Sequence, residues 1–274
     1  MTVSQYKATL SAYPGNIQTP ADFEAFWKQQ MDPGGVSVCA EALSFCSETA
    51  VYETLTISHS GGTVKARSIR PAGNGPFPLI LMFHNWTRGI RGWHHMTRFI
   101  ALGYAVIALE AEPFLADWKQ FPEQAQLFHR YQDALILAGA ARTLSYVDAG
   151  KIVTWGEGFG GGLAVAAAAM LPERAGCMAL NPMPADIRSV CTQADDSLQS
   201  RLDYTDTASF AAFVRGPALI GVCLMDEIAK PEGQYAIFNR LSCPKTLKVY
   251  PKYGHERVNA FENEILSFLH REYP

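Results

Sequence analysis

Three separate segments of the chain carry groups that could act together in catalysis. A glycine-rich turn, Gly156 to Gly162, follows the apolar run 151–155. Asp226 follows a second apolar run, and His255 follows a third. A carboxylate that orients an imidazole makes it an effective general base, because the ring is then held in one tautomer and one orientation. Asp226 and His255 are therefore the first candidates for a functional site.

The segments that must position these groups alternate between short strands and helices. Apolar runs without alternation are typical of strands that are buried on both faces. The predicted strands of this kind are 77–83, 104–109, 151–155, 176–180, 217–224 and 246–250, and the predicted helices between them are 96–102, 124–146, 160–171, 233–241 and 257–270. This order predicts a mostly parallel central sheet with helices on both faces.

Two further elements are predicted ahead of the buried strands. Pro20 at a helix start, followed by acidic residues, favours an amphipathic helix that presents Phe23, Phe26 and Trp27. Residues 51–57 and 63–69 alternate around Gly61-Gly62, a pattern that predicts an N-terminal hairpin.

The chain shows no internal repeat and no linker, so we expect residues 1–274 to form a single domain. Its size is within the range of one α/β unit. The polar, irregular segment 182–215 interrupts the strand–helix alternation, and we expect it to form a short cap-like helical excursion over the edge of the sheet.

Ligands of open parallel sheets bind beyond the carboxyl ends of the strands. The glycine turn, Asp226 and His255 each follow a predicted strand. A turn, then an acid, then a histidine is also the chain order of the catalytic triad in α/β-hydrolases. The sequence therefore predicts an α/β-hydrolase fold.

The chain resembles the acetyl xylan esterase and cephalosporin-C deacetylase family, known as carbohydrate esterase family seven. The matching pieces are the P-x-D-F-x-x-F-W motif from Pro20, the hairpin, the loop 83–92, the segment KIVTWGEGFGGG, and the stretch that runs from Leu202 through PALIGVCLMDEIAKP to LKVYPKYGHE. The resemblance implies deacetylation of small or carbohydrate esters, with Asp226 as triad acid and His255 as triad base. It also implies assembly into a homo-oligomer.

The chain departs from the family pattern at the nucleophile. Members carry Gly-x-Ser-x-Gly, whereas this sequence reads Gly156-Glu157-Gly158-Phe159-Gly160. Glycine has no side chain, so Gly158 cannot form an acyl-enzyme. The family's Arg-Gly-Gln motif is also lost, because its place after 104–109 reads Glu110-Ala-Glu-Pro113. We therefore expect no serine-esterase activity.

Three hypotheses follow for the function. The chain is a repurposed member that binds a small acylated or carbohydrate-like ligand, or a deacetylase, or a scaffold without a ligand. The deacetylase would be an engineered Ser→Gly form or would use water activated by His255. Its oxyanion hole would consist of the backbone N–H groups of Phe159 and Trp86. Glu157 is a poor substitute nucleophile, because a neighbour on a sharp turn points its side chain elsewhere.

Two alternative kinds of site are disfavoured. Gly156, Gly158 and Gly161 spell the dinucleotide pattern G-x-G-x-x-G, but the next predicted strand does not end in the acidic residue that a ribose would need. His84 stands where members of the resembled family have loop residues, and His94 and His95 lack a cysteine or carboxylate at metal-ligand spacing. We therefore expect no cofactor and no metal ion.

The composition restricts the partners and the location. Lys plus Arg is 23 and Asp plus Glu is 26, so the net charge is −3, which gives no electrostatic attraction to nucleic acid or anionic lipid. No apolar stretch approaches the ~20 residues of a membrane span, and residues 1–16 lack the pattern of a secretory signal. We expect a cytoplasmic protein whose six cysteines stay reduced.

Overall fold

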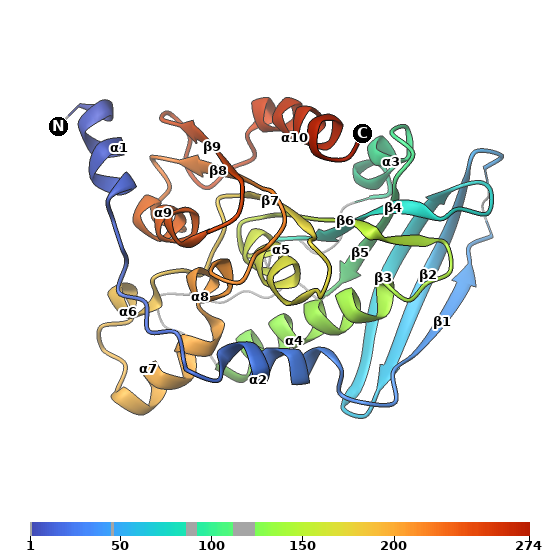
Figure 1. Cartoon of the computed structure of the whole chain (residues 1–274), viewed down its shortest axis with the longest axis horizontal. Helices are drawn as coiled ribbons and strands as arrows, with labels where there is room; N and C mark the ends of the chain where they lie inside the picture. The colour runs from blue at the N-terminus through green and yellow to red at the C-terminus, as the bar shows by residue number, and fades with distance from the viewer. Residues whose placement is uncertain (1, 45–46, 86–91, 112–123) are drawn as a thin grey trace.

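The computed structural model describes residues 2–44, 47–85, 92–111 and 124–274 (Figure 1). In these residues nine strands form one sheet in the order β1-β2-β3-β5-β4-β6-β7-β8-β9. Their bounds are β1 Ser37–Ala42, β2 Ala50–His59, β3 Gly62–Pro71, β4 Phe77–Phe83, β5 Ala105–Glu110, β6 Val147–Glu157, β7 Gly176–Leu180, β8 Ala218–Cys223 and β9 Lys245–Tyr250.

The sheet has an antiparallel part and a longer parallel part. β1, β2 and β3 pair antiparallel, as do β3 and β5, whereas every pair from β5 through β4 to β9 is parallel. The hairpin of β2 and β3 agrees with the pattern read from the sequence. The pattern did not reveal β1, because this edge strand is largely exposed and carries no apolar alternation.

The helices cover both faces of the sheet. They are α1 Val3–Ser11, α2 Phe23–Met31, α3 His94–Ile100, α4 Gln124–Ala141, α5 Phe159–Met170, α9 Pro231–Arg240 and α10 Asn259–Glu272. Along β4, Leu79, Leu81 and Phe83 pack into the core that holds α2, α4, α5 and α9, while Ile80 and Met82 pack into the core that holds α3 and α10. Figure 1 shows these two groups of helices on opposite sides of the sheet. The predicted mostly parallel sheet with helices on both faces is confirmed.

The segment 182–215 contains α6 Ile187–Val190, α7 Asp196–Leu202, a 3-10 turn at Asp203–Thr205 and α8 Thr207–Ala211. It is helical, as expected, but α8 is fully buried against α5 and α9. Whether the segment acts as a cap over a ligand stays a prediction.

Helix α5 lies unusually close to the strand ends. All of its residues are buried, and a Cβ on Gly160 would come within 2.3 Å of the Phe83 carbonyl oxygen. A side chain at this position would therefore push the start of α5 away from the end of β4. This close packing fixes the turn that contains Gly158.

Candidate functional site

The site lies where four parallel strands end. Asn85 follows β4, Gly158 lies between β6 and α5, Asp226 follows β8, and His255 follows β9. Because these strands run in the same direction, their carboxyl ends meet at one edge of the sheet. Residues far apart in sequence thereby come into hydrogen-bonding distance.

Asp226 and His255 form an ordered acid–base pair. The buried Asp226 Oδ2 lies 2.9 Å from His255 Nδ1. Asp226 Oδ1 accepts hydrogen bonds from the backbone N–H groups of Ile228 at 2.9 Å and Ala229 at 2.8 Å, and the Gln234 amide also donates to Oδ2. A carboxylate only accepts, so Nδ1 carries the proton and Nε2 is left as the acceptor. The imidazole is thus arranged as a base.

Gly158 occupies a backbone conformation that suits glycine. Its φ is 57° and its ψ is −124° at the first turn of α5. The conformation is held by hydrogen bonds from Gly158 N–H to the Leu180 carbonyl at 2.8 Å and from Met183 N–H to the Gly158 carbonyl at 3.1 Å. L-residues with a side chain reach this region only with strain. The turn has the strand-to-helix form of a nucleophile elbow, but it presents no side chain.

Asn85 lies in the space in front of Gly158. Its Nδ2 is 3.1 Å from His255 Nε2, and its Oδ1 accepts a hydrogen bond from the Phe159 backbone N–H at 3.3 Å. We call the volume bounded by Gly158, His255 Nε2 and Phe159 N–H the nucleophile space. Asn85 is not among the site residues predicted from the sequence. The available signal was its position just after a buried strand.

The structure brings four of the five sequence-predicted site residues together. Gly158, Phe159, Asp226 and His255 surround or adjoin the nucleophile space. Trp86, the predicted second oxyanion donor, lies outside the described residues. The roles assigned to Phe159 and Trp86 in an oxyanion hole stay predictions.

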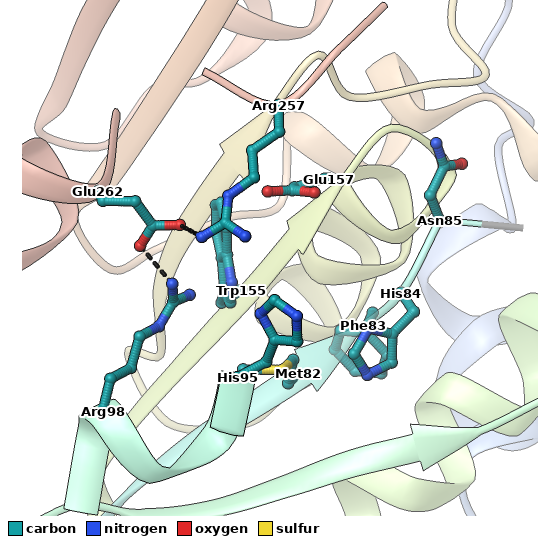
Figure 2. A pocket seen from close by; sticks show the side chains of 10 residues that line it. All are labelled: Met82, Phe83, His84, Asn85, His95, Arg98, Trp155, Glu157, Arg257 and Glu262. Atoms are coloured by element: carbon teal, nitrogen blue, oxygen red, sulfur yellow. Dashed lines mark hydrogen bonds and ion pairs between the residues drawn. The ribbon is translucent and has the colours of Figure 1, made fainter. Parts of the chain in front are cut away.

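A small charged cleft adjoins Asn85 (Figure 2). Arg257 Nη2 donates to Glu262 Oε1 at 2.7 Å, and Arg98 forms an ion pair with the other oxygen of the same carboxylate. Glu157, from the end of β6, lines this cleft. The cleft measures about 30 Å³, which is room for water-sized molecules only.

A larger cavity of about 390 Å³ lies between the segment 182–190 and the start of α9. Met183, Ser189, Lys230 and Gln234 are among the residues that line it. Gln234, which lines the cavity, also donates to Asp226 Oδ2 and so links the cavity wall to the acid–base pair. Its volume lies in the range of small-molecule sites.

Other candidate sites receive little support from the geometry. His84 and His95 both line the small cleft, yet the described residues include no group of three or more histidine, cysteine, aspartate or glutamate side chains placed to hold a metal ion. The glycines of the G-x-G-x-x-G pattern serve close packing, because a Cβ on Gly156 would lie 2.1 Å from the Gly160 carbonyl oxygen. None of the helices in the described ranges combines the length and the hydrophobicity of a membrane span.

Solved structures of acetyl xylan esterases share this fold. The chain matches acetyl xylan esterase 1 from Thermoanaerobacterium sp. JW/SL YS485 with a TM-score of 0.84 and 24% identity, over 100% of this chain and 99% of that one. It matches the acetyl xylan esterase from Paenibacillus sp. R4 with the same TM-score and 19% identity, over 99% and 100% of the two chains. The α/β-hydrolase fold predicted from the sequence is confirmed.

Two sequence comparisons complete the assignment. A stretch of 102 residues, 36% of this chain, is 31% identical to the quorum-quenching protein AidA of Acinetobacter baumannii, and the match covers 34% of that relative's length. The model of the acetyl xylan esterase (AXE1) family matches residues 5–113, 120–200 and 192–272, which is nearly the whole chain. The chain therefore belongs to the acetyl xylan esterase family.

Proposed function

We propose that this chain is a member of the family that forms no acyl-enzyme and binds a small acylated or carbohydrate-like ligand. The observation that carries the proposal is Gly158 at the elbow, opposite an ordered pair of Asp226 and His255. Acyl transfer to the protein requires a side-chain nucleophile beside the base. Here the base faces the Asn85 carboxamide instead. An amide nitrogen is not a useful nucleophile, because its lone pair is delocalised into the carbonyl.

The cavity of about 390 Å³ offers space for the ligand. Its lining combines the apolar side chain of Met183 with the polar groups of Ser189 and Lys230. Such a mixture suits a ligand that has both hydroxyl groups and apolar faces, as an acetylated sugar does. Gln234 lines the cavity and donates to Asp226 Oδ2, so it connects this ligand space to the acid–base pair.

The first test addresses the missing acyl-enzyme. The chain is mixed with p-nitrophenyl acetate, quenched in acid and examined by peptide mass mapping. We expect neither a burst of p-nitrophenol nor an acetylated peptide that depends on His255. A burst and an acetyl adduct that both disappear in His255→Ala would contradict the proposal.

The second test addresses the ligand. We expect an acetylated xylo-oligosaccharide to raise the melting temperature of the chain, because a ligand that binds only the folded state stabilises it. Ser189→Trp would fill the cavity and abolish the shift, whereas Ser200→Trp, on the exposed face of α7, would leave it unchanged. Equal shifts in both variants would place the ligand elsewhere.

A second candidate function is hydrolysis by water that His255 activates. The bond between His255 Nδ1 and Asp226 favours it, because Nε2 is left able to take a proton. A water that displaces the Asn85 amide from Nε2 would attack the acyl carbon and pass a proton to Nε2, and the departing alkoxide would take that proton. Hydrolases that lack a triad member retain roughly 10³–10⁴-fold over water. A trace esterase rate that is unchanged in His255→Ala would exclude this route.

The remaining expectations are part of the proposal. We propose a single domain over 1–274, a homo-oligomer and a cytoplasmic location, all of which rest on the sequence and the resemblance. Sedimentation analysis of the purified chain tests the oligomer, and a monomer at micromolar concentration would contradict it.

A further inference from the structure

We infer that the carboxamide of Asn85 is a built-in occupant of the nucleophile space, so that a nucleophile at position 158 has to displace it and functions far better when residue 85 is reduced in size. The inference rests on the proposed function, because it explains how the site is closed after the loss of the nucleophile. If the inference holds, the effects of substitutions at positions 85 and 158 depend on each other.

The carboxamide contacts the two groups that a reacting ester would use. Its oxygen accepts from Phe159 N–H at 3.3 Å, the donor expected to face an oxyanion. Its nitrogen lies 3.1 Å from His255 Nε2, where the nucleophile's hydroxyl would have to be. The Asn85 oxygen thus takes the place of the ester's carbonyl oxygen, and the Asn85 nitrogen takes the place of the nucleophile's hydroxyl group.

The orientation of the carboxamide follows from its partners. Asp226 holds the proton on His255 Nδ1, so Nε2 accepts and must face the amide N–H. Phe159 N–H donates and must face the amide oxygen. A flipped amide would place two donors against each other and two acceptors against each other. The pair of contacts therefore favours one arrangement of Asn85.

A side chain at position 158 is incompatible with this arrangement. A Cβ there would lie 2.6 Å from Asn85 Nδ2, 2.8 Å from Cγ and 2.9 Å from Oδ1. These separations are shorter than the distances at which Cβ atoms pack against other heavy atoms. A serine introduced alone would have to displace Asn85 or be displaced itself. Glycine at position 85 removes all three of these atoms, so the same serine would no longer meet them and could approach His255 Nε2.

Together, Gly158→Ser and Asn85→Gly would restore acyl transfer through a serine nucleophile. In Gly158→Ser/Asn85→Gly, the serine Oγ–H proton passes to His255 Nε2 as the Oγ–C bond forms. The ester C–O bond breaks, and p-nitrophenol leaves with that proton. Water then attacks the acyl carbon, and its proton passes through His255 to Oγ, which releases acetate and regenerates the serine.

Four chains test the inference: the unmodified chain, Gly158→Ser, Asn85→Gly and the double variant, all assayed with p-nitrophenyl acetate and by peptide mass mapping. We expect acetylation of residue 158 in the double variant, at a rate about 100-fold above Gly158→Ser, as for a misplaced catalytic group. Gly158→Ala/Asn85→Gly, which adds a Cβ without a hydroxyl, is the matched control and should not be acetylated.

Two results would overturn the inference. They are a Gly158→Ser chain as reactive as the double variant, and a folded double variant that is not acetylated. In both cases the proposed function stands, since it concerns the unmodified chain. A His255-dependent acetyl adduct on the unmodified chain would instead overturn the proposed function.

A second measurement does not depend on the folding of the serine variants. Asn85→Gly with Gly158 unchanged removes the donor to His255 Nε2. We expect a change in the ¹⁵N chemical shift of His255 Nε2 and a small change at Nδ1, which keeps its bond to Asp226. An unchanged Nε2 signal would show that Asn85 does not occupy the nucleophile space.

Discussion

The Asn85 side chain and the missing side chain of Gly158 fit each other: Asn85 Nδ2 lies 2.6 Å from the point where a Cβ on Gly158 would be. One residue therefore requires the absence of the other's side chain. Gly158 also adopts its φ of 57° without the strain that a serine carries at this turn. The elbow of this chain is consequently a relaxed form of a catalytic turn.

Gly158→Ala should destabilise the chain by about 2–6 kcal/mol, because backbone strain costs about 1–3 kcal/mol and overpacking a similar amount. Urea unfolding of the two single variants and of Gly158→Ala/Asn85→Gly measures the coupling between the positions. We expect Asn85→Gly to recover the overpacking part only. Strict additivity of the two changes would contradict the contact.

Gly160→Ala should lower the free energy of unfolding by about 1–3 kcal/mol, because its Cβ would lie 2.3 Å from the Phe83 carbonyl oxygen. The exposed Gly150 serves as the control, since its Cβ would meet only the side chain of Asp148 at 3.3 Å. Urea unfolding of both variants is the measurement. Equal effects would show that the close approach of α5 to β4 is not required.

Asp226→Ala should cost about 1–3 kcal/mol of stability, because it leaves the buried N–H group of Ala229 without its acceptor. The N–H group of Ile228, which is exposed, also loses its acceptor but can bond to water. Asp226→Asn keeps one oxygen for these groups and should cost less. Thermal unfolding of both variants compares them. If the asparagine variant were the less stable, the carboxylate would act mainly through its charge.

The buried carboxyl of Asp206 should make stability depend on pH. Burial raises the pKa of Asp206 from its ordinary value to about 6, even though the carboxyl accepts hydrogen bonds from Ile187 and Ala208 N–H groups. Between pH 4 and 6 the folded state therefore binds more protons than the unfolded state, so stability falls as the pH rises. The loss attributable to Asp206 is about 3 kcal/mol by pH 7.

Asp206→Asn isolates this contribution, since the amide oxygen still caps α8 but does not titrate. Unfolding free energies of the two chains at pH 4.5, 5.5 and 7 should converge toward low pH and diverge toward neutral pH, with the asparagine variant favoured. A constant difference across this range would show that Asp206 titrates at its ordinary pKa.

Much of the fold could be predicted from the sequence, because strands buried on both faces are continuous apolar runs. The predicted strands 77–83 and 176–180 match β4 and β7 at both ends. The helix predicted at 124–146 ends at Ala141, because the residues before β6 form turns. The polar composition of 182–215 suggested an open excursion, yet α8 is buried with its polar side chains bonded internally. Amino-acid composition alone does not show which buried polar side chains find hydrogen-bond partners.

For the site, residue identity alone shows that position 158 has no nucleophile, and chain order alone shows that an acid and a histidine follow the expected strands. What fills the nucleophile space depends instead on how the strands are assembled. Asn85 reaches Gly158, Phe159 and His255 because four parallel strands end at one edge, and contacts between such distant segments have no local pattern in the chain.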